Sequence, residues 1–167
     1  KGQKILIHGG AGGIGTFAIQ IARHIGAYTA TTVSKNDIQH AKDLGADEVI
    51  DYKNQAFEKM LKDFDAVFDT VGGQTYERSF KVLKKGGIIV SMLEQPNKGL
   101  MDQHGVKAIA QFTQITGDRL SKLAELVDKG VIRLHVDKSF QLDQAGEALH
   151  YLQTGHPRGK IVVEVKE

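Results

Sequence analysis

The sequence predicts an α/β fold, a doubly wound parallel (Rossmann) sheet with strand order 3-2-1-4-5-6. Strand-like apolar segments alternate with helical stripes up to about residue 112, and the connections between them are short. A glycine-rich turn, Gly10–Gly15, joins the first strand to the first helix. Such alternation is typical of a parallel sheet with helices on both faces, and right-handed crossovers give the doubly wound order.

The first strand, expected over 4–9, runs directly into the sequence Gly10-Ala11-Gly12-Gly13-Ile14-Gly15, which fits G-x-G-x-x-G. In this motif the glycines allow a tight turn, close approach of a pyrophosphate and close helix–strand packing. The following helix, expected over 13–25 and closed by Gly26, directs its free N–H groups at the phosphates. Its predicted apolar stripe is Ile14, Phe17, Ala18, Ile21, Ala22 and Ile25. The alternative is a glycine turn of another α/β domain.

The later elements follow from the same periodicities. Strands are expected at 28–33, 48–51, 65–69, 87–92 and 106–112, the last near a sheet edge. Helices are expected at 36–44, around Phe57–Leu61 and along the stripe Tyr76, Phe80 and Leu83, while 94–105 is predicted to be a loop. The tail is expected to form a helix ending at Gly130, an extended segment at 135–142, a helix capped by Asp143, a turn at 155–159 and a strand at 161–165.

Composition narrows the possible functions. The 167 residues fit one domain or one domain plus a part of another, and 41% apolar residues suffice for a core. A net charge of +2 gives no argument for nucleic acid or an anionic membrane as partner. The chain has no cysteine, so we expect a reducing compartment, and we predict a cytoplasmic location. Because the chain starts with Lys1 almost at the first strand, we also expect a fragment of a longer polypeptide.

The end of the second strand bears on cofactor choice. NAD-preferring sites usually place a carboxylate there to hold the ribose 2′-OH, whereas this strand ends in Val33-Ser34-Lys35. A hydroxyl and an ammonium group at this position favour a 2′-phosphate, so the sequence predicts NADP(H) over NAD(H). Asp37 is the open alternative, since its carboxylate could turn toward the ribose. Ser34 could also be only a helix cap, and Lys35 a solvated side chain.

Four motifs in order resemble the medium-chain dehydrogenase/reductase superfamily, in its quinone oxidoreductase-like and enoyl reductase-like, zinc-independent branch. They are Gly9–Gly15 with Ala18-Ile19-Gln20, Leu44–Tyr52, Asp69–Gly73 and Gly155–Val165, and together they extend over nearly all of the chain. The resemblance implies a cofactor-binding domain at 1–116. It assigns 117–167 largely to a substrate domain whose main part lies outside this chain.

The resemblance also implies site residues. Gly10, Ala11, Gly12, Gly13, Ile14 and Gly15 would hold the pyrophosphate, while Ser34, Lys35 and Tyr52 would contact the 2′-phosphate. Thr70, Val71, Ser91, Met92 and Leu93 would lie near the cofactor, the last three on the nicotinamide side. For Tyr52 the alternative is surface packing, and for Val71 and Leu93 it is an ordinary core position.

The implied reaction is hydride transfer from NADPH to a quinone or a carbonyl-conjugated alkene. No residue of this chain is a convincing catalytic acid or base, so the catalytic residues stay unknown. Asp51, Asp69 and His8 are predicted to be structural, and no His spacing suggests a metal site. Because the substrate cleft is incomplete in this chain, we expect it to bind cofactor without turnover. A non-catalytic nucleotide-sensing module is the alternative, while a P-loop is disfavoured because Thr16 and Phe17 follow the turn.

Two surface predictions complete the analysis. Relatives pair their sixth strands, so the strand at 106–112 is predicted to form a homodimer through its free edge. Residues 117–167 are expected to expose apolar surface that the missing part of the substrate domain would cover. The expected ligands are small molecules, with neither a nucleic acid nor a membrane as partner.

Overall fold

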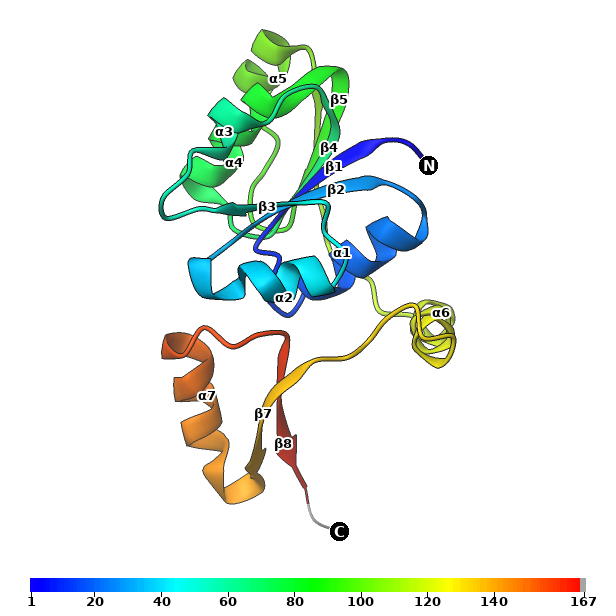
Figure 1. Ribbon diagram of the computed structural model, residues 1–167, viewed down its shortest axis with the longest axis vertical. Coiled ribbons are helices and arrows are strands. Elements are labelled where there is room, and N and C mark those ends of the chain that lie inside the picture. Colours follow the sequence, from blue (N-terminus) through cyan, green and yellow to red (C-terminus); the bar gives the residue numbers. More distant parts are fainter. Residues whose placement is uncertain (166–167) are drawn as a thin grey trace.

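The structure, a computed structural model, describes residues 1–165 and confirms the predicted fold class (Figure 1). Six parallel strands form one sheet in the predicted order β3-β2-β1-β4-β5-β6. The strands are β1 (Lys4–His8), β2 (Tyr28–Val33), β3 (Glu48–Asp51), β4 (Phe64–Asp69), β5 (Leu83–Ser91) and β6 (Lys107–Ala110).

Helices cover both faces of this sheet, as the alternation predicts (Figure 1). On one face lie α1 (Gly15–His24) and α2 (Ile38–Asp43), and on the other lie α3 (Phe57–Met60), α4 (Gly73–Ser79) and α5 (Lys98–His104). Short 3₁₀ turns precede α2 at Lys35–Asp37 and β5 at Phe80–Val82. Successive residues of β1 face opposite sides of the sheet. Leu6 packs in the apolar cluster under α3, α4 and α5, and Ile7 packs in the apolar cluster under α1.

The predicted loop at 94–105 is wrong, because its second half is the helix α5. The Asn97 side chain caps this helix by accepting a hydrogen bond from the Leu100 backbone N–H at 3.1 Å. Gly105 ends it in the left-handed conformation. Leu100 and Met101 pack against the core, so a short apolar contact stabilises a helix in a segment whose composition resembles a loop.

Two further element predictions need correction. Leu83 begins β5 and does not continue the helix of Tyr76, because α4 gives way to a 3₁₀ turn. The predicted stripe of α1 is also displaced, since Ile14 and Ile25 are exposed. The buried residues of α1 are Gly15, Thr16, Ile19, Gln20 and Ala22. This helix lies between the sheet and the C-terminal segment, so two of its sides are covered and polar residues are buried as well.

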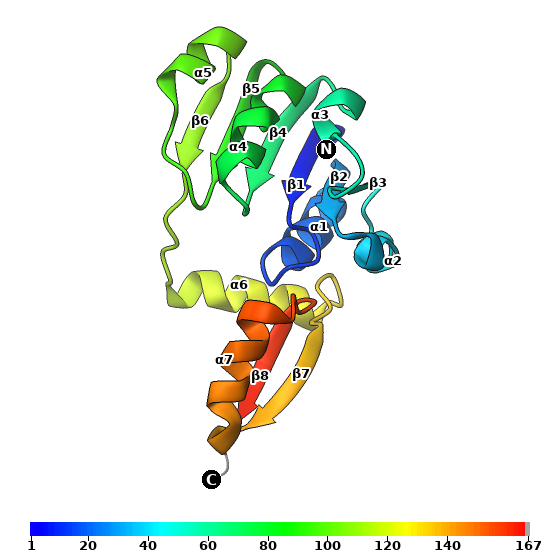
Figure 2. The same ribbon diagram turned by 90° about the vertical axis from the view of Figure 1, so that its left-hand side faces the viewer.

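The C-terminal segment, which we define as residues 117–165, lies at the carboxyl ends of the sheet strands (Figure 2). It contains α6 (Gly117–Asp128), β7 (Val136–Gln141), a 3₁₀ turn (Leu142–Gln144), α7 (Ala145–Thr154) and β8 (Lys160–Glu164). Strands β7 and β8 pair in parallel as a separate small sheet. The prediction that Asp143 caps the helix is wrong, because the N-cap residue of α7 is Gln144, which forms no side-chain cap. Gln141 and Gln144 form a capping box at the 3₁₀ turn that precedes α7.

Hydrogen bonds attach the C-terminal segment to α1. The Gln20 side-chain amide donates to the Arg133 carbonyl oxygen at 3.2 Å and accepts from the Arg133 backbone N–H at 2.8 Å. Gln20 is buried, so this two-way contact is shielded from water. A single side chain of the first helix therefore satisfies both backbone groups of a residue 113 positions further along the chain.

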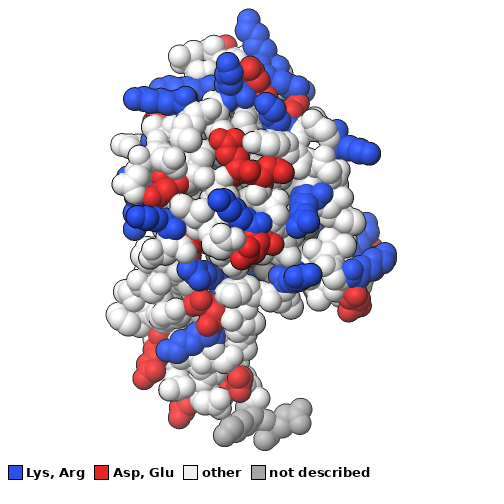
Figure 3. All heavy atoms as spheres, in the orientation of Figure 1, with Lys and Arg blue, Asp and Glu red and all other residues white. Residues whose placement is uncertain are grey.

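The charged side chains do not form a field of one sign. On the face shown in Figure 3, lysine and arginine side chains alternate with aspartate and glutamate over both parts of the molecule. On this face, recognition of a charged ligand would therefore depend on a local arrangement of groups. Within residues 1–165, no helix has the length and apolar character needed to cross a membrane.

Candidate functional site

The turn between β1 and α1 requires glycine for steric reasons. A Cβ on Gly10 would overlap the Thr31 hydroxyl, and one on Gly15 would overlap the Gly9 carbonyl oxygen and lie 2.7 Å from the Gly10 Cα. Gly9 itself has φ +71, in the left-handed region that favours glycine. The turn is therefore as tight as the glycine motif predicts.

The start of α1 offers unused backbone donors. Ile14 is the N-cap residue and supplies no side-chain cap. Within the described residues, no acceptor pairs with the backbone N–H groups of Gly13 or Ile14. Free N–H groups at the positive end of a helix dipole attract an anion. The chemistry of this turn therefore suits a phosphate group.

The sheet order brings the other predicted residues to the same edge as the glycine turn. Ser34 follows β2, and Tyr52 follows β3, where its backbone N–H donates to the Val33 carbonyl oxygen at 3.1 Å. Thr70 and Leu93 follow β4 and β5. All of these strands point their carboxyl ends toward the C-terminal segment (Figure 2). Ligands of open α/β sheets bind at this edge.

Ser34 and Asp37 form a polar cluster with a residue of the C-terminal segment. The Ser34 hydroxyl donates to Asp37 Oδ2 at 2.5 Å, and Arg158 Nε donates to Asp37 Oδ1 at 2.6 Å. Arg158 Nη2 also donates to the Asn36 carbonyl oxygen at 2.8 Å. Burial disfavours the charged carboxylate, but the hydrogen bonds from Ser34 and Arg158 prevail and hold the Asp37 pKa below its usual value. Lys35 lies exposed beside this cluster.

Sequence reasoning missed Arg158 and Lys160 as site residues. Between them, the Gly159 backbone N–H donates to the Ala11 carbonyl oxygen at 2.9 Å, which fixes this strap (residues 155–160) against the glycine turn. The Lys160 ammonium nitrogen lies 2.8 Å from where a Cβ on Gly13 would be. The basic residues beside Gly159 were visible in the sequence. Their position was not, because Arg158 and Asp37 are 121 residues apart.

The residues predicted near the cofactor after β4 and β5 differ in their exposure to solvent. Val71 and Leu93 are 50% and 64% exposed, so the alternative that they are core residues is wrong. Thr70 is half-buried and donates to the His8 carbonyl oxygen at 2.8 Å. Ser91 is buried, and its hydroxyl donates to Asp69 at 2.7 Å. The Ser91 hydroxyl is thus engaged within the protein, whereas the side chains of Val71 and Leu93 are accessible.

Met92 and the buried carboxylates complete this side of the site. The Met92 backbone N–H donates to the Asp69 carbonyl oxygen at 3.0 Å, which places this residue at the end of β5. Asp69 Oδ1 accepts from the backbone N–H groups of Val71 and Gly72. Asp51 similarly accepts from the Asn54 side chain at 2.6 Å. Both carboxylates shape turns, in agreement with their predicted structural role.

His8, below the glycine turn, is a hydrogen-bonded core residue, as predicted. Its Nε2 lies 2.8 Å from the Ser79 hydroxyl and its Nδ1 lies 2.9 Å from the Thr32 hydroxyl. The Ser79 hydroxyl donates to the Thr75 carbonyl oxygen, so it accepts from His8 Nε2–H, and Nδ1 accepts from Thr32. Burial lowers the His8 pKa to about 4. His8 is therefore neutral at pH 7 and is fixed in one tautomer.

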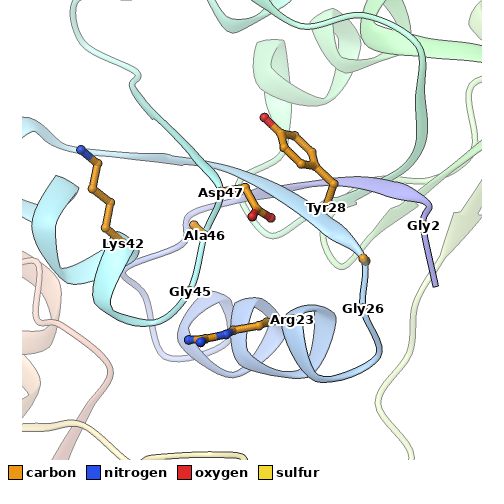
Figure 4. A pocket seen from close by; sticks show the side chains of 9 residues that line it. Gly2, Arg23, Gly26, Tyr28, Lys42, Gly45, Ala46 and Asp47 are labelled. Carbon is orange, nitrogen blue, oxygen red and sulfur yellow. The ribbon is translucent and has the colours of Figure 1, made fainter.

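A hollow lies at the opposite end of the sheet, where β2 and β3 begin (Figure 4). Tyr28 and Asp47 line it, together with Arg23 and Lys42 from the last turns of α1 and α2. These two basic side chains complement the negative ends of the helix dipoles, and Figure 4 shows that they extend in different directions. They explain the charge of this hollow without a ligand, so the candidate site is the carboxyl edge.

Comparison with known proteins shows which family this chain is similar to. The profile of a family described as zinc-binding dehydrogenase matches residues 44–163. A zebrafish (Danio rerio) protein named NAD(P)H oxidoreductase RTN4IP1, mitochondrial, is 34% identical over 99% of this chain and 50% of its own. The chloroplastic NADPH-dependent alkenal/one oxidoreductase of Arabidopsis thaliana is 32% identical over 97% of this chain and 40% of its own.

A solved structure extends the agreement to three dimensions. The quinone oxidoreductase of Coxiella burnetii is 36% identical and superimposes with a TM-score of 0.92, over 99% of this chain and 54% of its own. The chain therefore spans about half the length of the relatives it matches. The similarity includes both the sheet and the C-terminal segment, so the two parts occur together in these proteins.

The family description raises the question of zinc. Zinc sites in proteins are built from cysteine, histidine and carboxylate ligands. The chain has no cysteine, and within residues 1–165 no three side chains of His, Asp or Glu lie close enough together to hold a metal ion. The described residues do not fit a zinc site, and the prediction that this chain binds no metal stays a prediction.

Proposed function

Because the chain belongs to the zinc-binding dehydrogenase family of the medium-chain dehydrogenase/reductase superfamily, we propose that it is the NADP(H)-binding part of an oxidoreductase. The bound nicotinamide would carry the hydride that reduces a quinone or a carbonyl-conjugated alkene. The main support is that the glycine turn and the cluster of Ser34, Lys35 and Arg158 lie at the same edge of the sheet. The names of the relatives support the same chemistry.

The proposed phosphate contacts follow from the donors at this edge. The backbone of Gly10–Gly15 would hold the pyrophosphate, because it is free of side chains at its tightest points and has unpaired N–H groups. The Lys160 ammonium group, which lies over Gly13, would add a positive charge there. Ser34, Lys35, Tyr52 and Arg158 would bind the 2′-phosphate, which distinguishes NADPH from NADH.

The proposed nicotinamide contacts are the groups after β4 and β5. Thr70, Val71, Met92 and Leu93 would line this end of the cofactor, and Val71 and Leu93 would present apolar surface to the ring. Ser91 would act through the turn that its hydroxyl holds. Neutral His8 would keep the end of β1 in place and would take no part in proton transfer at pH 7.

We also propose the division of the chain into a cofactor domain at 1–116 and a segment at 117–167 that completes a substrate domain. Many large apolar side chains of this segment are exposed. They include Leu120, Leu134, Leu142, Leu149 and Leu152. A missing partner region would cover them and would form the substrate cleft, so the chain alone would bind cofactor without turnover. The catalytic groups would then lie in that region.

Calorimetric titration with NADPH and NADH, side by side, tests the proposal. We expect tight binding of NADPH and weaker binding of NADH. Lys35→Ala should weaken NADPH binding about tenfold, because one phosphate contact is lost, and leave NADH unchanged. Lys42→Ala, which removes an equal charge from the far end of α2, should change neither affinity. Equal affinities for the two cofactors would refute the 2′-phosphate pocket, and binding of neither would refute the proposed function in favour of another ligand.

We also propose that the chain forms a homodimer through β6. Strand β6 is an edge strand that pairs only with β5 within the described sheet, and Ile109 on it is 46% exposed. An uncovered strand edge with an apolar side chain favours pairing with a second copy. Light scattering at high protein concentration should show a dimer, and a strict monomer would contradict it. The cytoplasmic location stays a prediction, and a relative is named as mitochondrial.

A further inference from the structure

Two of the four residues proposed to bind the 2′-phosphate, Ser34 and Arg158, already donate to a carboxylate of the protein itself. We propose that Asp37 is an internal competitor of the 2′-phosphate: it holds Ser34 and Arg158 in the free protein and must be displaced when NADPH binds. This inference rests on the proposed function and goes beyond it, because it identifies a residue that opposes NADPH binding and so reduces the discrimination between NADPH and NADH. The contact also latches the strap to the rest of the molecule.

The geometry of Asp37 is that of a bound anion. Each carboxylate oxygen accepts one hydrogen bond, Oδ2 from the Ser34 hydroxyl at 2.5 Å and Oδ1 from Arg158 Nε at 2.6 Å. The Asp37 side chain is only 17% exposed, whereas that of Arg158 is 41% exposed. A phosphate oxygen placed on the same donors would have to occupy the volume of this carboxylate. The two anions therefore cannot share the Ser34 hydroxyl proton and the Arg158 Nε–H.

Charge makes the exclusion stronger than the overlap alone. A 2′-phosphate carries nearly two negative charges, and a carboxylate a few ångströms away repels it. Lys35 can offset part of this repulsion, since within residues 1–165 it forms no ion pair with a carboxylate. NADH has no 2′-phosphate and leaves the Asp37–Arg158 pair intact. Ser34, Lys35 and Arg158 raise the affinity for NADPH relative to NADH, and Asp37 consequently reduces this ratio of affinities.

The ion pair of Asp37 and Arg158 also connects the proposed cofactor site with the C-terminal segment. In the free protein Arg158 bonds to Asp37 and to the Asn36 carbonyl oxygen, and Gly159 bonds to Ala11. Loss of the Asp37 charge weakens the first of these contacts. A bound 2′-phosphate replaces it with a stronger ionic contact to Arg158. The strap should therefore be held by Asp37 before binding and by the cofactor afterwards.

The test compares Asp37→Asn with Asp43→Asn. Asparagine keeps the shape of Asp37 at the N-cap of α2, a position that it favours, so the fold is preserved. Asp43 lies on the same helix and accepts a hydrogen bond from Gln39. Within residues 1–165 it forms no ion pair with the strap, so its variant controls for the change in net charge. Titrations with NADPH and NADH should show that Asp37→Asn binds NADPH about tenfold more tightly. Its affinity for NADH should stay equal or fall.

Hydrogen exchange of residues 155–160 supplies a second readout. Without cofactor, exchange in Asp37→Asn should be faster than in the wild type, and saturating NADPH should make the two equal. Unchanged or weaker NADPH binding by Asp37→Asn would overturn the inference, as would an equal gain from Asp43→Asn. A wild type that binds neither cofactor would show that the proposed function itself has failed, which is visible before any variant is compared.

Discussion

The sheet domain and the C-terminal segment are stabilised by different interactions. Residues 1–110 contain two clusters of buried apolar side chains, one on each face of the sheet. Among the described residues after 110, only Ile132, Phe140 and Ala148 are buried apolar residues, and α6 buries none. The sheet domain thus gains its stability from apolar burial, and the C-terminal segment is attached to it largely by polar contacts. Such a segment can detach locally while the sheet stays folded.

The largest expected effect comes from closing the glycine turn to a side chain. Gly15→Ala places a Cβ against backbone atoms of Gly9 and Gly10, which cannot rotate away. We expect the free energy of unfolding, measured by urea titration, to fall by about 3 kcal/mol. Gly146→Ala is the counterpart in α7, where a Cβ meets nothing within 4 Å, and it should stabilise that helix by about 0.5–1 kcal/mol. Equal effects of the two variants would contradict the contrast between the regions.

Acid should destabilise the sheet domain through His8. Burial depresses its folded-state pKa to about 4, so the neutral form is favoured by folding. The contribution is fully present above the unfolded-state pKa of about 6.5 and is lost as the pH falls through the folded-state pKa. We expect His8 to lower the free energy of unfolding by about 3 kcal/mol over this pH range. Urea titrations at a series of pH values measure this loss.

A substitution identifies the group responsible for this pH dependence. His8→Gln should be less stable at pH 7 because it loses the bonds to Thr32 and Ser79, but its stability should decline less between pH 6.5 and 4. His24→Gln changes an exposed histidine at the end of α1 and should retain the wild-type slope. If the dependence of stability on pH is the same in His8→Gln, other groups are responsible for the acid sensitivity. One such group is His40, which lies beside His135 and whose own pKa is lowered by burial.

Docking of the C-terminal segment should depend on Gln20 more than on any single apolar contact. Gln20→Ala leaves both backbone groups of Arg133 without their partner, which we expect to cost about 2 kcal/mol of docking free energy. Hydrogen exchange in β7 and α7 should accelerate while exchange in β1 and β4 stays the same. Gln39→Ala, an exposed residue of α2, should alter neither region. Uniform acceleration throughout the chain would show instead that the two regions unfold together.

The same contrast explains what the sequence could predict. Strand order and the position of Ser34, Lys35 and Tyr52 follow from local patterns, because parallel strands place their carboxyl ends at one edge. The role of Arg158 depends on a contact across 121 residues, and no local pattern encodes that partner. The buried face of α1 differs from the predicted stripe for a related reason. The C-terminal segment covers a second side of this helix, so its burial is not that of a helix with one apolar stripe.

The α5 helix shows the opposite case. Local capping signals for a helix are present in the sequence, but the composition of the segment favours a loop. Asn97 three residues before Leu100, and Gly105 at the end, are typical helix start and stop signals. Pro96 and two glycines made the segment resemble a loop. The contact of Leu100 and Met101 with the core decides the matter in favour of the helix. Capping residues were thus more informative here than composition.

The smallest expected effect distinguishes burial from mere hydrophobicity in the C-terminal segment. Leu149 is 63% exposed, whereas its neighbour Ala148 on α7 is 2% exposed. Leu149→Lys should change the free energy of unfolding by less than about 0.5 kcal/mol and reduce the binding of a hydrophobic dye. Ala148→Lys should destabilise the segment strongly, because a charge is forced into its small core. If Leu149→Lys proved as damaging as Ala148→Lys, the leucines of this segment would form a core in solution, and the contrast with the sheet domain would be one of degree.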